Sequence, residues 1–342
     1  MEIVNYFSKT KSKVMQDFLL IGVDVSKASL DICFKPMGTL LRIENNPVGY
    51  KQWITELHKF YVDNAKLLVV MEHTGRYSKR FETFMQSQKI AYCKVAALQI
   101  KRSLGVVRGK DDKIDAQRIA EYGWLRRDIL VADPIVEESI QELQSLLSLR
   151  SKLVRDRSGY VCRLKELSVA GDSLNSFEGK LQQQVIKVLT AKIDEIEVKI
   201  KALISTNAEL SKTCDLLRSI KGIGWIVASY MIACTANFKR FRNARKFNCY
   251  AGLAPFKHES GTSIKTRSRI SHLANKQAKT ILNLAACCAI RFDPELKKYY
   301  QKRVAEGKRK MSCLNIIRSK IVGRMFAVVK RQTPFIQHVQ AA

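Results

Sequence analysis

The chain has 342 residues, enough for two or three domains, and 46% of them are apolar, which excludes a disordered polymer. Lysine and arginine number 60 against 31 aspartates and glutamates, and this net charge of +29 indicates a polyanionic partner, usually nucleic acid, with an anionic membrane as the alternative. No apolar run could span a bilayer, no signal peptide is visible, and the nine cysteines form no CxxC pair, so we expect reduced thiols in a cytoplasm and no membrane partner.

Residues 1–135 are predicted to form an α/β domain. Apolar runs rich in β-branched residues and alternating segments predict strands at 18–27, 28–35, 40–46, 65–72 and 90–95. Helical spacing predicts helices at 48–62, 77–88 and 97–104, and a longer helix that begins at Asp112. Three strands, then a helix, a strand, a helix, a strand and a helix is the order of a ribonuclease H-like fold.

Residues 136–212 carry the apolar repeat of a coiled coil. Apolar residues step by three and four along the second half of this segment, at Ile186, Leu189, Ile193, Ile196, Ile200 and Leu203. A similar seam starts at Val136, and a loop is predicted at 168–179 between the two. The seams could close as a helical hairpin within one chain or serve as a dimerisation arm. We favour the dimerisation arm, and hence a homo-oligomer, dimer or tetramer.

The last third, residues 213–342, is predicted to be rich in helices and to hold most of the excess charge. It carries 26 basic and 5 acidic residues, so its net charge is +21, and we expect it to bind the polyanion. The stretch "IKGIG" places Lys221, Gly222 and Gly224 between two apolar helical segments. This resembles a helix-hairpin-helix turn whose backbone approaches a phosphate, and a tight packing turn is the alternative. Residues 250–276 break the helical period.

Four acidic residues occupy matching ends of predicted elements in residues 1–135. Asp24 lies at the end of the first strand and Glu72 at the end of the fourth, and these two strands are adjacent in the predicted fold. Asp112 and Asp115 share one face of the last helix. Each could be an ordinary acid, and the helical pair could simply favour a helix N-terminus. Four converging carboxylates without nearby cations would repel one another, so together they predict a site for a hard divalent ion, Mg²⁺ with Mn²⁺ as a substitute.

Several motifs together resemble a known family. They are "IGVDVSK", "VVMEHTGRYS", "KDDKIDAQRIA", "IKGIG" and "YAGLAPFKHESG", and they occur in the order found in the DEDD transposases of the bacterial insertion-sequence 110 family, also called bridge recombinases. The resemblance implies a RuvC-like catalytic domain at 1–135, a coiled-coil segment at 136–212 and a transposase domain at 213–342. It also implies donor and target DNA and a structured non-coding guide RNA as partners, in the bacterial cytoplasm at the nucleoid.

The resemblance also implies a catalytic serine at Ser260, in the step "SG". A serine hydroxyl that attacks a DNA phosphate forms a covalent link and conserves the bond energy for rejoining. Ser263, Ser268 and Ser271 are rivals by spacing alone, and a plain polar loop is the alternative reading of "ESGTS". Basic residues near this serine are candidates for nucleic-acid contacts, namely Lys257, Lys265, Arg267, Arg269 and Lys276.

The chain departs from the family pattern at three positions. Lys221 stands where the family often has proline, and His272 and Ala274 interrupt a stretch that often carries lysine and glycine. Two other functions remain open. A metal-dependent DNA nuclease or Holliday junction resolvase would use the four carboxylates alone and would form no protein–DNA adduct. A non-catalytic nucleic-acid-binding protein would account for the charge of the last third but not for the four matched acids.

Overall fold

The computed structural model describes residues 18–60, 67–73, 75, 77–103, 112–260, 264–271 and 273–336, with some side chains outside the description, among them those of Asp112, Ser260 and most of residues 257–269. The chain divides into two compact units, residues 1–135 and 136–342. Within the described ranges, no helix is long and apolar enough to cross a membrane.

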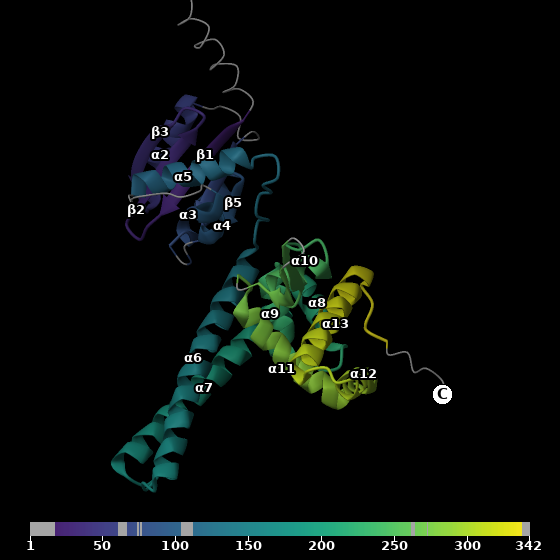
Figure 1. Ribbon diagram of the computed structural model, residues 1–342. Coiled ribbons are helices and arrows are strands. Elements are labelled where there is room, and N and C mark those ends of the chain that lie inside the picture. The colour runs from purple at the N-terminus through teal and green to yellow at the C-terminus, as the bar shows by residue number, and fades with distance from the viewer. Residues whose placement is uncertain are drawn as a thin grey trace, which may run out of the picture. The chain divides into compact units, whose positions relative to one another are not determined.

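The first unit is built on a five-stranded mixed sheet with the order β3-β2-β1-β4-β5 (Figure 1). β1, β2 and β3 form an antiparallel meander, and β4 and β5 run parallel to β1. The predicted strand order is confirmed, including the adjacency of the first and fourth strands. The elements are β1 (Leu19–Val25), β2 (Ser29–Lys35), β3 (Thr39–Glu44), α2 (Pro47–Phe60), β4 (Leu67–Glu72), α3 (Lys79–Ser87), β5 (Tyr92–Val95), α4 (Ala97–Ser103) and α5 (Asp112–Leu125).

Helices cover both faces of this sheet. Alternate strand residues such as Ile21 and Val23 pack against the aromatic and apolar side chains of α2 and α3, with Trp53 and Phe81 fully buried between them. The opposite face carries Leu20, Cys33 and Val70, and it packs against α4 and α5. Because strand side chains alternate between faces, each strand contributes to both cores, which explains the nearly continuous apolar runs in the sequence.

The second unit begins with a long helical hairpin. α6 (Glu138–Ala170) and α7 (Phe177–Thr206) lie side by side and are joined within the predicted loop (Figure 1). Arg150 on α6 binds Glu197 on α7 with a nitrogen–oxygen distance of 2.6 Å. Ile193 and Ile200, which we expected to contact a second chain, are 2% and 1% exposed within a single chain. The seam is therefore intramolecular at these positions, and the oligomeric state stays a prediction.

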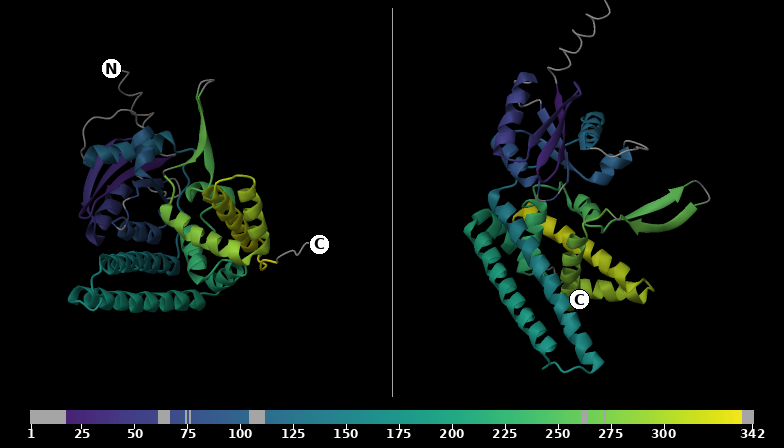
Figure 2. Two further views of the ribbon diagram at one scale, coloured as in Figure 1. Left: turned by 60° about the horizontal axis from the view of Figure 1, so that its bottom comes forward. Right: turned by 90° about the vertical axis from the view of Figure 1, so that its left-hand side faces the viewer.

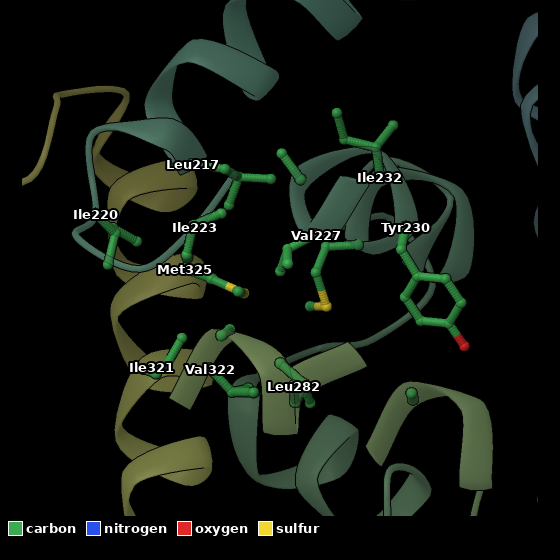
Figure 3. Close-up of a cluster of buried hydrophobic side chains, with 14 of the residues drawn as sticks. Leu217, Ile220, Ile223, Val227, Tyr230, Ile232, Leu282, Ile321, Val322 and Met325 are labelled. Atoms are coloured by element: carbon green, nitrogen blue, oxygen red, sulfur yellow. The ribbon is translucent and has the colours of Figure 1, made fainter. Parts of the chain in front are cut away.

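Helices form the body of the rest of this unit, as predicted for the last third. They enclose one apolar core, in which Met231 and Ile321 are fully buried, and Figure 3 shows side chains from α8, α9, α11 and α13 meeting in it. The helices are α8 (Ala208–Arg218), α9 (Trp225–Thr235), α10 (Ala244–Tyr250), α11 (Lys276–Phe292), α12 (Pro294–Ala305) and α13 (Lys310–Arg331).

A two-stranded antiparallel sheet interrupts these helices between α10 and α11. It consists of β6 (Pro255–Ser260) and β7 (Ile264–Ile270), and it projects from the helical body as a ribbon (Figure 2). The sequence showed only a break in helical period here. The strands escaped prediction because their residues are largely polar, so no apolar alternation marks a buried face.

Candidate active site

Asp24 and Glu72 lie on the same face of the first unit's sheet. β1 and β4 pair in parallel with Val23 opposite Met71, so the residues that follow them, Asp24 and Glu72, stand at one level on adjacent strands. Val23 and Met71 are buried on the α2 and α3 side. Because strand side chains alternate, Asp24 and Glu72 face the opposite side, where α5 lies, and both are half-buried.

α5 approaches this face closely because β1 carries a glycine there. A Cβ atom on Gly22 would lie 2.3 Å from the backbone nitrogen of Ala120 and 2.6 Å from the backbone oxygen of Ala116. Only glycine on the strand and small residues on the helix permit this backbone-to-backbone contact. The backbone of α5 at Ala116 and Ala120 therefore packs directly against β1 at Gly22, two residues before Asp24.

Two contacts at the other end fix the direction of α5. Glu121 binds Lys35, the last residue of β2, with an oxygen–nitrogen distance of 2.6 Å. Gly123 lies against the side chain of Leu20 near the start of β1. The C-terminal half of α5 therefore lies over the start of β1, and its N-terminal turn points toward the end of β1 that carries Asp24.

The spacing of the two elements brings the first turn of α5 level with Asp24. From Gly22 to Asp24 the strand advances about 6.8 Å. From Ala116 back to Asp112 the helix advances about 6 Å. The backbone of Asp112 thus reaches the level of Asp24, although the Asp112 side chain lies outside the description. The register of β1 and β4 and the direction of α5 therefore bring Asp24, Glu72 and the helical turn that begins at Asp112 to the same end of the sheet.

Asp115 already has a cationic partner. Its carboxylate accepts a hydrogen bond from the Arg118 guanidinium over 2.7 Å, and both side chains are partly buried. The predicted repulsion assumed no nearby cation, so this ion pair weakens the inference from repulsion alone. Among the side chains that the structure describes, no three His, Cys, Asp or Glu residues form a metal-binding group. The four predicted acids match a hard divalent ion through their chemistry, because carboxylate oxygens are the ligands that such ions prefer.

A fifth acid, Asp31, lies on this face and was not among the predicted site residues. Asp31 on β2 is the direct antiparallel partner of Asp24, so their side chains share a face of the sheet. It is 4% exposed, and its carboxylate oxygen lies 3.9 Å from the Arg42 guanidinium. The signal was present in "SLDICFK", where a lone carboxylate occupies the alternating position between Leu30 and Ile32.

Ser260 occupies a defined backbone position in the second unit. It is the last residue of β6 and pairs with Ile264, the first residue of β7, so its backbone lies at one end of the ribbon. The plain polar loop considered for this stretch is therefore wrong for the backbone of Ser260, which belongs to a strand. Of its rivals, Ser268 is exposed on β7, Ser271 is half-buried after it, and Ser263 lies outside the described residues.

Hydrogen bonds at the base hold the two ends of the ribbon together. The backbone nitrogen of Asn275 donates to the Tyr250 carbonyl over 2.8 Å, and the Asn275 amide donates to the Tyr250 hydroxyl over 2.8 Å. Asn275 also caps α11 by accepting from the Ala278 nitrogen over 2.9 Å. Burial raises the pKa of Tyr250 and, more strongly, of Tyr230, so both phenols stay protonated. This neutral network fixes where the ribbon leaves the helices.

Both units of the chain are similar to known protein families. A family model described as "Transposase" matches residues 21–167, the range that holds all four acids. A second model, described as "Transposase IS116/IS110/IS902 family", matches residues 214–301, which include Ser260. The chain belongs to the IS110 family of transposases.

Individual relatives of this transposase are distant but extend over most of its length. A pilin gene-inverting protein of Moraxella bovis is 25% identical over 326 residues, which cover 93% of this chain and 98% of that protein. The transposase for insertion sequence element IS1111A of Coxiella burnetii is 24% identical over 297 residues, covering 80% and 78%. A solved structure of T. thermophilus RuvC in complex with Holliday junction substrate covers 34% of this chain and 99% of its own, with 11% identity and a TM-score of 0.26.

The predicted phosphate-binding turn of the transposase lies between α8 and α9, and its two glycines differ in surroundings. Gly222 has a φ of +94°, and a Cβ there would lie 2.9 Å from the backbone of Ala285 and Ala289 on α11. This close packing supports the tight-turn reading. Gly224 is open, since a Cβ there would meet no atom within 4 Å, and it precedes α9 without a side-chain cap. Lys221 beside Gly222 is exposed.

The other basic candidates of the transposase lie on or next to the ribbon. Lys276 is exposed at the start of α11, one residue after Asn275. The remaining four lie on the two strands of the ribbon, and their side chains are outside the described part of the structure: Lys257, Lys265, Arg267 and Arg269. Their roles in nucleic-acid binding stay predictions.

Proposed function

We propose that this transposase cuts and rejoins DNA strands with two catalytic elements, a metal-binding carboxylate site in the first unit and the Ser260 hydroxyl in the second. The observation that carries the first element is the register of β1 and β4, which sets Asp24 and Glu72 side by side on adjacent strands, on the face that packs against α5. The fit of Gly22 against Ala116 and Ala120 holds α5 in place.

Asp24, Glu72, Asp112 and Asp115 would hold Mg²⁺, or Mn²⁺ as a substitute, through oxygen donors. The bound metal supplies Lewis-acid stabilisation of the charge that develops on the phosphate oxygens. Arg118 restrains the Asp115 carboxylate and lowers the repulsion within the acidic set while the site assembles.

In the covalent step, the Ser260 oxygen bonds to phosphorus as the bond between phosphorus and one deoxyribose oxygen breaks. The serine proton is released and the leaving oxygen takes up a proton. Attack by a deoxyribose hydroxyl on the phosphoserine reverses these changes and rejoins the strand without an external energy source. Basic residues close to Ser260 in the sequence, such as Lys257 and Arg267, would stabilise the negative charge that develops on the phosphate.

The gene-inverting relative supports strand exchange over simple hydrolysis. Inversion of a DNA segment, the property named in that relative, requires rejoining as well as cutting, and the alignment extends over nearly all of both chains. The resemblance noted in the sequence further supports a guide RNA, donor and target DNA as partners, and an oligomer in which carboxylates of one subunit act with the serine of another.

The carboxylate site is tested by the variants Asp24→Asn and Glu72→Gln. We expect each to abolish metal-dependent strand cleavage and to weaken Mn²⁺ binding measured by calorimetry. DNA affinity should stay within about twofold of wild type, since the basic residues expected to bind the phosphate backbone lie in the second unit. Asp128→Asn is the matched control, because Asp128 is an exposed acid three residues after the end of α5. Wild-type cleavage by Asp24→Asn would refute the assignment.

The serine is tested by trapping labelled DNA on the protein under denaturing conditions and mapping the modified peptide. Ser260→Ala should lose both cleavage and the adduct, whereas Ser268→Ala on the neighbouring strand should retain both. An adduct on another residue would move the assignment. Full cleavage without any adduct would instead establish the metal-dependent nuclease as the function.

A further inference from the structure

One helix of the second unit has a basic outer face that the proposed catalytic elements do not use. α12 buries Leu296 completely and half-buries Tyr299 and Tyr300 against the rest of the unit. Its exposed residues include Lys297, Lys298, Gln301 and Lys302. At 100° per residue, these four fall within an arc of about 140°, so the lysines form one continuous face.

The acids near this face are bound by other cations. Asp293, which caps α12, is fully buried and binds Arg324 over 2.6 Å, and Glu295 binds the same guanidinium over 2.6 Å. Glu306, after the end of α12, binds Arg303 over 2.9 Å and lies 4.0 Å from the Lys308 ammonium. Each of these acids is therefore paired with an arginine, including Glu295, which is 58% exposed and borders the lysine face.

The lysines of the outer face have no such partners. Within the residues that the structure covers, none of Lys297, Lys298 and Lys302 forms an ion pair, and the same holds for Arg309 and Lys310 in the turn that leads into α13. Lys298 and Lys302 stand four residues apart, where like charges repel and destabilise a helix. An ordinary solvated face intersperses both signs, and this face holds one sign only.

The chemistry of the face indicates a duplex phosphate backbone. Lysines bind phosphates as point charges and carry no base specificity. Single-stranded RNA is typically recognised by stacking on exposed aromatic rings. On α12 itself both tyrosines are half-buried, and the Tyr299 ring is covered by the Lys320 ammonium at 4.3 Å and the Arg303 guanidinium at 5.3 Å.

We propose that the outer face of α12, defined by Lys297, Lys298 and Lys302, together with Arg309 and Lys310 at the start of α13, binds the phosphate backbone of double-stranded DNA independently of sequence. Figure 1 shows α12 at the end of the second unit away from α10, after which the ribbon begins. The face thus contacts DNA away from the ribbon that carries Ser260. This inference depends on the proposed function in one respect, namely that the bound duplex is the DNA substrate.

The test uses the full chain and a random-sequence DNA duplex. The triple variant Lys297→Gln, Lys298→Gln, Lys302→Gln removes three potential phosphate contacts. The logarithm of affinity falls with the logarithm of salt concentration by about 0.9 per neutralised phosphate, so the slope should become shallower by up to about 2.7. At 0.1 M salt, affinity should fall by at least about tenfold.

A matched triple variant controls for the change in net charge. Lys187→Gln, Lys199→Gln and Lys201→Gln remove three exposed lysines from α7, and this variant should keep the wild-type slope. Equal losses in the two variants would assign the effect to net charge and overturn the proposal. So would a loss seen with duplex or hairpin RNA and not with DNA. The experiment measures DNA binding alone, so its result can be interpreted even if the metal site or the catalytic serine has been assigned wrongly.

Discussion

Replacement of Gly22 by alanine tests whether the close packing of α5 against β1 positions the carboxylates of the proposed site. The added Cβ would lie 2.3 Å from the nitrogen of Ala120, and ordinary contact begins at 3.4 Å. The atoms on the helix side belong to the backbone, so no side-chain rotation can relieve the overlap. The helix must therefore move away from the strand by about 1.1 Å, the difference between the two distances, or tilt by an equivalent amount.

Two effects follow from a displacement of this size. Inserting one carbon into a packed interior costs about 1–3 kcal/mol, and backbone on both sides of the contact points to the upper end. A misplacement of about 1 Å in a catalytic group costs about a hundredfold in rate. Asp112 and Asp115 belong to α5 and Asp24 belongs to β1, so a shift of the helix separates them. We therefore expect Gly22→Ala to lower the free energy of unfolding by about 3 kcal/mol and the rate of strand cleavage by about 100-fold.

Denaturant unfolding and a nicking assay on supercoiled DNA measure the two effects separately. Gly123→Ala is the matched control, because the atoms nearest to its Cβ would be side-chain methyl groups of Leu20 and Val70, at 2.8 and 3.0 Å, rather than backbone. It should lose less stability than Gly22→Ala and retain most activity. Wild-type cleavage and stability in Gly22→Ala would refute the view that this contact positions the acids.

The burial of single residues leads to three further predictions. Asp31→Asn should weaken Mn²⁺ binding measured by calorimetry by about tenfold, because a charge beside Asp24 is removed while the shape is kept, and Asp128→Asn should leave it unchanged. Ile200→Asp should lower the free energy of unfolding by about 4 kcal/mol, whereas a fall in mass by light scattering without loss of stability would favour the dimerisation arm. Burial, with a smaller contribution from Asp133, raises the pKa of Cys93 to about 11, so iodoacetamide at pH 8 should label exposed Cys162 and spare Cys93 until the chain unfolds, as read by peptide mass spectrometry.

The sequence by itself determined the elements of the first unit and the places of its acids. Buried strands read as apolar runs, and helices as 3.6-residue periods, because these patterns record local burial. Asp24 and Glu72 stand out since a carboxylate at the end of such a run is costly without a partner. The adjacency of β1 and β4 followed from the order of elements, which few α/β topologies satisfy.

The tertiary structure decided what depends on register and on packing between distant segments. The pairing of Asp24 with Asp31 is set by hydrogen bonds between strands, and the seat of α5 on Gly22 by contact between residues about a hundred positions apart. The same holds for the α6 and α7 seam, because a heptad pattern gives equal support to a partner in the same chain or another. The ribbon that carries Ser260 was invisible in the sequence, since backbone pairing and the Asn275 hydrogen bonds, rather than an apolar face, hold it.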